Sequence, residues 1–540
     1  MKTASFWVFQ ALAVLGFLAS GPRSFGATEL YNAQALRDQF GLSAYIGEPG
    51  LAKIKIAILD NGFAGFDPKS GTLPTNAELI EKYDGAPLGD SLEPTAHGLY
   101  LAEAIWSLTG KAPDGPKFYL LNTAGMTNLR NAVDFSIHHS VDVILYSQNW
   151  EYGGNFDGRG FINQVVNEAT SHGIIWVNAA GNYHNQVYNG PIPDSNRCFR
   201  FKNRFDSNEV MMVLSWNDFQ DTENYQTKKD LDFFVTDSQG HVVAQSDLAQ
   251  MKLPHDTRTP SLHAREITEA LLNRGDFCLK IKNISQNFTS SDRIRLTIFS
   301  EDKPGDSIDF IDHTSGNEIM VPADNPTVIT VGDTSPESAV GPTMDGRTKP
   351  DVVLPSVPAT FTDGFISSGT SNSAAYVAAI AVAMKGRDAS VNRAEVISYI
   401  DSVVANGNDN DPDGISLIDP AVVSELERLG GISRADIVKV TVETGRKVLW
   451  LRKNPIDLGN LYGNLRNSCG LAGLDPESAA CSDAFEYFIA PNPASAPGAP
   501  QVATYYLSKE YAGPLPPILL QTDASGTFVW VELRQADSEP

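Results

Sequence analysis

Apolar runs of strand length alternate with amphipathic stretches along the first third of the chain. The run from Ile54 to Leu59 comes first; further strand-like runs lie at 117–121, 141–146 and 174–177, and helix-like stretches lie at 97–106, 128–139 and 161–172. Strands joined by a helix run parallel, because the crossover brings the chain back to the same edge of the sheet. The alternation therefore predicts an α/β fold with a doubly wound parallel sheet and helices on both faces.

The same alternation returns near residue 325, with strand-like runs at 325–332 and 349–353 and helix-like stretches at 371–384, 393–404 and 420–429. From Cys198 to about Ser300, short strand-like pieces separated by turn residues predict a small inserted β-sandwich, in which 264–273 is the main helical candidate. The last region is strand-rich, and strands are expected there at 438–442, 447–451, 502–507 and 527–533. The expected organisation is a signal peptide at 1–26, an α/β domain in two parts at 27–197 and 301–430, an inserted β domain at 198–300 and a C-terminal accessory region at 431–540.

The first residues have the character of an export signal. Lys2 precedes an apolar run from Phe6 to Leu18, and small residues follow up to Ala27. We therefore expect a secreted or periplasmic protein that has no membrane attachment once the signal is removed. The formal net charge of −24 argues against nucleic acid and anionic membranes as partners, because the average surface of the protein would repel them. The sequence indicates no particular oligomeric state.

Cysteines and acidic residues provide two further local predictions. The 4 cysteines of an exported chain predict two disulfides, and their spacing favours Cys198 with Cys278 and Cys469 with Cys481. The first bridge would fasten the β insert to its host. The stretch 406–414 resembles the start of a calcium loop, but Pro420 stands where an EF-hand needs Glu. A solvated turn is therefore favoured over a calcium site, and no other cofactor or metal is expected.

Polar residues occupy the ends of several predicted elements. Asp60 ends the first strand, His97 opens a helix, Asn182 follows a small-residue turn, and Ser371 begins the alanine-rich helix. Each residue alone is explained more simply as a turn former or a helix cap. Together they provide a carboxylate, an imidazole, an uncharged amide donor and a hydroxyl, which is the set of groups that an acyl-transfer site uses.

These residues, with their neighbours, resemble the subtilisin-like serine proteases. The resemblance extends from about Ile54 to Leu429, apart from the β insert, and its motifs are Asp60-Asn61-Gly62, His97-Gly98, Ala179-Ala180-Gly181-Asn182, Asp345-Gly346-Arg347-Thr348-Lys349-Pro350-Asp351-Val352 and Gly369-Thr370-Ser371. It implies a catalytic triad of Asp60, His97 and Ser371. It also implies that the side chain of Asn182 and the backbone N–H of Ser371 bind the oxyanion.

The resemblance further implies that Ser147, Gln148 and Asn149, at the end of a strand, lie along the substrate and pair with its backbone. The family has small residues after that serine, so the bulky side chains here, including Trp150, are expected to narrow the specificity pocket. Other departures are Asn61 after the aspartate, Leu99 after His-Gly, and Ala375 in place of a proline. None of them removes a catalytic group.

The expected function is that of an exported serine endopeptidase that acts on protein or peptide substrates through an acyl-enzyme. The alternative from another class is a catalytically silent protein of the same fold that binds peptides or partners. Among enzymes, an esterase or a transpeptidase that uses the same acyl-enzyme also remains open.

Overall fold

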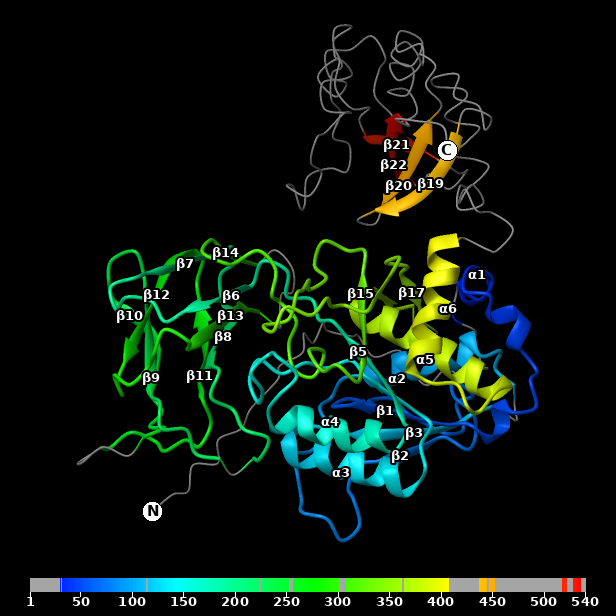
Figure 1. Cartoon of the computed structure of the whole chain (residues 1–540), viewed down its shortest axis with the longest axis horizontal. Coiled ribbons are helices and arrows are strands. Elements are labelled where there is room, and N and C mark those ends of the chain that lie inside the picture. The colour runs from blue at the N-terminus through cyan, green and yellow to red at the C-terminus, as the bar shows by residue number, and fades with distance from the viewer. Residues whose placement is uncertain are drawn as a thin grey trace, which may run out of the picture. The chain divides into compact units, whose positions relative to one another are not determined.

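The computed structural model of the chain is shown in Figure 1. It describes residues 30, 32–112, 115–223, 225–251, 256–300, 307–361 and 364–406, and the strands at 437–443, 446–451, 517–521 and 528–535. The described residues belong to two units: the first runs to Ser398 without 334–336, and the second holds 334–336 and everything from Tyr399 on. The predicted signal peptide, the calcium-like stretch from 407, the helix at 420–429, the strand at 502–507 and the Cys469–Cys481 pair lie outside the described residues.

A seven-stranded sheet in the order β16-β15-β5-β4-β1-β3-β2 forms the centre of the first unit. All its strand pairs are parallel. The strands are β1 (Lys55–Asp60), β2 (Glu78–Ile80), β3 (Lys117–Asn122), β4 (Val143–Tyr146), β5 (Ile175–Ala179), β15 (Ile329–Asp333) and β16 (Val352–Leu354). The next two strands in the chain, β2 and β3, lie on one side of β1, and the later strands β4, β5, β15 and β16 lie on its other side. This strand order confirms the predicted doubly wound α/β sheet.

Helices cover both faces of this sheet (Figure 1). On one face α2 (His97–Leu108) packs against α5 (Thr370–Arg387), and on the other α3 (Gly125–His138) packs against α4 (Phe161–Ser171). Ala57 and Leu59 belong to the hydrophobic cluster that includes the buried residues of α3 and α4. Because successive side chains of a strand point to opposite faces, Asp60 lies on the face covered by α2 and α5. The described residues also form α1 (Ala33–Gln39), α6 (Arg393–Asn406) and short 3-10 turns at Leu42–Tyr45 and Leu51–Lys53.

Two antiparallel sheets form the β region between β5 and β15. The five-stranded sheet has the order β10-β9-β12-β7-β14, and the four-stranded sheet has the order β11-β8-β13-β6. Their strands are β6 (Val187–Pro191), β7 (Phe199–Asn203), β8 (Asn208–Trp216), β9 (Leu231–Thr236), β10 (Val242–Ser246), β11 (Arg265–Leu272), β12 (Gly275–Asn283), β13 (Arg293–Phe299) and β14 (Ile308–Phe310). Buried residues of both sheets share one hydrophobic cluster with the α/β sheet, so the β region packs directly on its host.

Two expectations about this region were wrong. The stretch 264–273 is not a helix: Arg265–Leu272 forms β11 and pairs with β8 along its whole length. Cross-strand pairing provides backbone hydrogen bonds and side-chain contacts that outweigh the helix propensity of this short segment. The disulfide between Cys198 and Cys278 does form, but it joins β12 to the residue before the neighbouring strand β7. It therefore links two parts of the β region and does not fasten that region to its host.

The C-terminal unit contains a four-stranded sheet in the order β19-β20-β22-β21. Its strands are β19 (Ile437–Glu443), β20 (Arg446–Leu451), β21 (Pro517–Gln521) and β22 (Phe528–Gln535). Three of them coincide with the strands expected at 438–442, 447–451 and 527–533. In the described ranges, none of the helices combines the length and apolar character that crossing a bilayer requires.

Removing the disulfide should destabilise the protein. The two cysteines are 80 residues apart in the chain, so the bridge closes a long loop in the unfolded state. We expect the double variant Cys198→Ser/Cys278→Ser to lose about 2–4 kcal/mol of unfolding free energy, measured by urea denaturation. Wild-type protein treated with a reductant should show the same loss. An unchanged denaturation midpoint for both samples would contradict the expectation.

Candidate active site

Asp60 and His97 form a hydrogen-bonded pair at the carboxyl end of β1. Asp60 is fully buried, and its Oδ2 lies 2.7 Å from Nδ1 of His97, whose side chain is 35% exposed. The other oxygen, Oδ1, accepts a hydrogen bond from the backbone N–H of Gly62 at 3.0 Å. Gly98 permits this close approach, because a Cβ there would lie 2.5 Å from Cβ of Asp60. The pair thus joins the end of a central strand to the start of α2.

The pKa of His97 reflects two opposing effects. Burial alone would lower the pKa of this imidazole, but the negative charge of Asp60 and the hydrogen bond to it outweigh burial and raise the pKa above its ordinary value. A carboxylate partner at Nδ1 also favours the tautomer in which Nδ1 carries the proton and Nε2 accepts one. His97 is therefore arranged as a base whose protonated form is stabilised.

Ser371 is the second residue of α5 and is partly exposed. The helix is preceded by Gly369, whose φ of 108° lies in the region that favours glycine and which provides no side chain to cap the helix. Within the described chain, the backbone N–H of Ser371 has no hydrogen-bond partner, as expected for the first turn of a helix. The serine thus lies beside an available backbone donor and the positive end of a helix dipole.

An aromatic stack connects α2, which carries His97, with the hairpin that precedes α5 and Ser371. Tyr100, one turn after His97 in α2, stacks on Phe361 and Phe365, with ring centroids 4.6 and 5.2 Å apart. These two phenylalanines belong to the hairpin of β17 (Ala359–Thr360) and β18 (Ile366–Ser367), which leads directly into α5. In the described structure no hydrogen bond joins the hydroxyl of Ser371 to His97. Catalytic hydrogen bonds are often long without substrate and tighten when it binds.

Asn182 is exposed and contacts the residue before Ser371. Its Oδ1 accepts hydrogen bonds from the backbone N–H of Thr370 at 3.3 Å and from the Thr370 hydroxyl at 3.1 Å. That hydroxyl in turn accepts from the backbone N–H of Gly181 at 3.2 Å. Because the oxygen of the amide faces Thr370, the NH₂ group of Asn182 remains as a donor next to Gly369. Asn182 and the N–H of Ser371 therefore provide two donors at the same helix end.

Hydrogen bonds join the segment after β4 to the end of β5, which leads into the turn that carries Asn182. Asn149 donates from Nδ2 to the carbonyl of Ala179 at 3.2 Å, and its Oδ1 accepts from Asn178 at 3.3 Å. Ser147 is buried, and Oε1 of Gln148 accepts from Thr123 at 3.4 Å. Asn149 therefore bridges the two segments through these hydrogen bonds.

Trp150, unlike Asn149, packs against the hydrophobic core. Its indole N–H donates to the hydroxyl of Tyr146 at 2.7 Å, and Tyr146 is fully buried. Its backbone pairs with Val321 in an isolated antiparallel bridge. The indole thus packs against the protein core, and Asn149 is the bulky residue that contacts the Asn182 turn.

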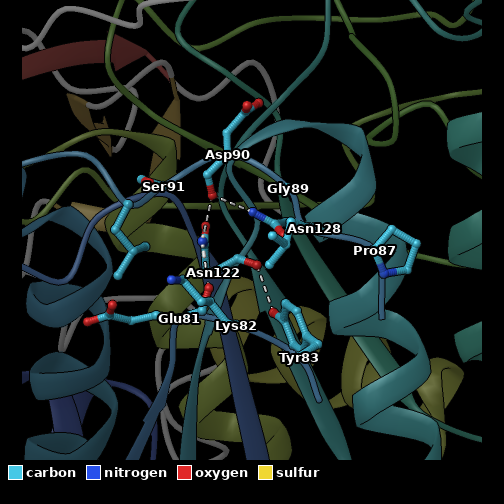
Figure 2. A pocket seen from close by; sticks show the side chains of 11 residues that line it. Glu81, Lys82, Tyr83, Pro87, Gly89, Asp90, Ser91, Asn122 and Asn128 are labelled. Atoms are coloured by element: carbon cyan, nitrogen blue, oxygen red, sulfur yellow. Dashed lines mark hydrogen bonds between the residues drawn. The ribbon is translucent and has the colours of Figure 1, made fainter. Parts of the chain in front are cut away.

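A pocket lies one strand away from Asp60, at the end of β3 (Figure 2). Asn122, which is paired in register with Asp60, donates from Nδ2 to the carbonyls of Glu81 and Asp90, each at 3.0 Å. Asn128 also donates to the carbonyl of Asp90, at 2.7 Å, and the hydroxyl of Tyr83 donates to the carbonyl of Asn122 at 2.7 Å. Asp60, His97 and Ser371 do not line this pocket. Its polar groups hold in place the loop that leads to His97.

Glu93 is a second carboxyl group near the Asp60–His97 pair that sequence reasoning missed. Its backbone N–H donates to the carbonyl of Asn61 at 2.8 Å, and its Oε2 is buried without a partner among the described residues. Burial raises the pKa of Glu93 to about 7; a hydrogen bond with Asn61 lowers it, and the charge of Asp60 raises it. No sequence pattern indicated this position. Within the described ranges, no group of three or more His, Cys, Asp or Glu residues is placed to hold a metal ion.

The subtilase family profile matches residues 52–415 of this chain, which is more than half of its length. The chain therefore belongs to the subtilase family, a family of serine proteases. A search of curated proteins returned no match.

Among solved structures, the chain is similar to the CspB protease of Clostridium perfringens, with 15% identity over 66% of this chain and 88% of that one and a TM-score of 0.42. It is also similar to MycP1 from Mycobacterium smegmatis, with 15% identity over 70% of this chain and 79% of that one and a TM-score of 0.30.

Ionisation of Glu93 should cost stability. The pKa of Glu93 is about 7 in the folded protein and near 4.5 in the unfolded chain, so the folded protein holds the proton more tightly. The loss of folding stability caused by ionising Glu93 therefore grows as the pH rises from 4.5 through 7. We expect Glu93→Gln to be more stable than wild type by about 1–2 kcal/mol at pH 8, allowing for partial exposure, with little difference at pH 4. Urea denaturation at both pH values measures this. The exposed Glu81→Gln is the control, and an equal effect of Glu93→Gln at both pH values would contradict the account.

Proposed function

We propose that this protein is an exported serine endopeptidase in which Asp60, His97 and Ser371 form the catalytic triad. The observation that carries the proposal is the hydrogen bond of 2.7 Å between Asp60 and His97, on the sheet face that α5 and Ser371 also occupy. Membership of the subtilase family supports the same assignment. Export is supported by the apolar run at Phe6–Leu18.

The proposed reaction begins when Ser371 attacks the carbonyl carbon of a peptide bond. A serine hydroxyl is a weak nucleophile at its own pKa, so Nε2 of His97 must take its proton during the attack. Asp60 keeps the imidazole in the required tautomer and stabilises the imidazolium that forms, which agrees with the raised pKa of His97. His97 then gives the proton to the leaving amine. Water, activated by the same imidazole, hydrolyses the acyl-enzyme.

The negative charge of the tetrahedral intermediate would be met by two donors. These are the NH₂ group of Asn182, oriented by Thr370, and the backbone N–H of Ser371 at the start of α5. Both groups are fixed before substrate binds, so they require little reorganisation during the reaction. The loss of one such donor typically lowers turnover by about 100- to 1,000-fold.

Asn149 provides the basis for a specificity proposal. We propose that the side chain of the residue before the scissile bond passes between the Ser147–Asn149 segment and the Ala179–Asn182 turn. Asn149 bridges these two segments through hydrogen bonds to Ala179 and Asn178. We therefore propose that the enzyme cleaves after residues with small side chains.

A fluorophosphonate probe tests the proposed nucleophile. We expect the wild type and Ser373→Ala to be labelled and Ser371→Ala to remain unlabelled, because Ser373 is buried whereas Ser371 is partly exposed and follows Thr370, the partner of Asn182. Labelling also requires neutral His97, so its rate should rise with pH through a midpoint above the ordinary value of 6.5. Folded wild-type protein that does not react would contradict the proposal and favour a silent protein that binds peptides.

Replacing Asn149 should widen specificity. We expect Asn149→Gly to raise kcat/KM for substrates with Phe before the scissile bond by at least about tenfold relative to those with Ala, because the added space accepts the ring. A peptide-library cleavage profile of both proteins measures this, with Asn196→Gly, at an exposed position between β6 and β7, as the control. A wild-type preference for large aromatic residues would contradict the role of Asn149.

A further inference from the structure

Glu318 is a fully buried carboxylate that takes no part in the proposed chemistry but contacts the turn that carries Asn182. Its Oε2 lies 3.1 Å from Nδ1 of His184, and its Oε1 accepts from the backbone N–H of Asn185 at 3.1 Å. One residue, Tyr183, separates Asn182 from His184 and Asn185. Glu318 therefore contacts one side chain and one backbone N–H just beyond the proposed oxyanion donor.

The turn beyond Asn182 has a defined conformation that Glu318 contacts directly. Asn185 adopts a φ of 61°, in the left-handed region, which Asn occupies more often than most residues other than glycine. The backbone N–H of Asn185 is bound by the carboxylate of Glu318, which fixes the position of this residue. The hydrogen bond to Glu318 also raises the pKa of His184, although burial opposes this.

Glu318 is itself held by the β region and by the host. Arg295 of β13 donates to the carbonyls of Asn317 and Ile319, the residues on either side of Glu318, at 2.6 and 2.8 Å. On the other side, the backbone N–H of Val340 donates to Oε2 of Glu318 at 3.0 Å. Glu318 thus sits where the chain returns from the β region, on a backbone fixed from both sides.

From these contacts we infer that Glu318, acting through His184 and Asn185, is a positioning residue for the oxyanion donor Asn182. The inference rests on the proposed function, because it assigns Asn182 to the oxyanion. The contacts provide a continuous path from β13 through Arg295 and Glu318 to the Asn182 turn. The β region thereby takes part in holding the active site in its working geometry, beyond stabilising the fold.

His184→Ala is the main test variant, because His184 is 33% exposed and Glu318 keeps the N–H donors of Asn185 and Val340 when the imidazole is removed. We expect its second-order rate of labelling by the fluorophosphonate probe to fall by about 10- to 100-fold, since a small displacement of a catalytic group is enough for such a loss. His184→Asn should restore most of the rate, because its amide NH₂ can replace the Nδ1–H donor. In the Asn182→Ala background, His184→Ala should have little further effect.

His241→Ala is the matched control. His241 forms a similar pair with Asp237, at 3.2 Å, in the turn between β9 and β10, and its loss should leave the labelling rate unchanged. Hydrogen exchange of peptides that cover 181–186 provides a readout independent of the probe, and it should be faster in His184→Ala than in the wild type.

The outcomes separate the two proposals. A labelled wild type whose rate and 181–186 exchange are unaffected by His184→Ala overturns only the positioning role. An effect of His184→Ala that remains in full in the Asn182→Ala background would also overturn it. A folded wild type that is not labelled overturns the proposed function and the positioning role together.

Discussion

The burial of the Asp60 carboxylate constrains everything around the carboxyl end of β1. A charge removed from water is very costly unless hydrogen bonds and an opposite or polarisable partner replace its hydration. Asp60 has both: the N–H of Gly62 binds one oxygen and the imidazole of His97 meets the other. For His97 to reach that position, α2 must start within contact distance of the strand end, which Gly98 allows. The Asp60–His97 pair can therefore form only if β1 and the start of α2 pack closely, and the pair in turn stabilises that packing.

The second half of the site depends on packing between distant segments. α5 is buried along most of its length, and its alanines let it lie close to both the sheet and α2. The stack of Tyr100 on Phe361 and Phe365 fixes the hairpin before Ser371 against α2. On the other side, Thr370 connects the helix start to the turn of Gly181 and Asn182. The proposed nucleophile, base and oxyanion donors are thus held by separate contacts on rigid elements.

Sequence reasoning predicted those parts of the fold that depend on local periodicity. The parallel strands and helices of the α/β sheet follow from apolar spacing, and Asp60, His97, Asn182 and Ser371 stood out because each ends or begins such an element. The reasoning was wrong at 264–273, where pairing with β8 outweighs helix propensity. It missed Glu93 and Glu318, because their importance comes from burial and from partners that only the folded chain brings together.

The central claim is that Ser371 forms a covalent acyl-enzyme. An activated ester that acylates quickly and deacylates slowly at low pH, followed by acid quenching and mass spectrometry, tests this most directly. The account predicts one acyl group per chain, which fragmentation of the peptide assigns to the oxygen of Ser371. An acyl group on Ser373, or none on folded protein, would contradict it.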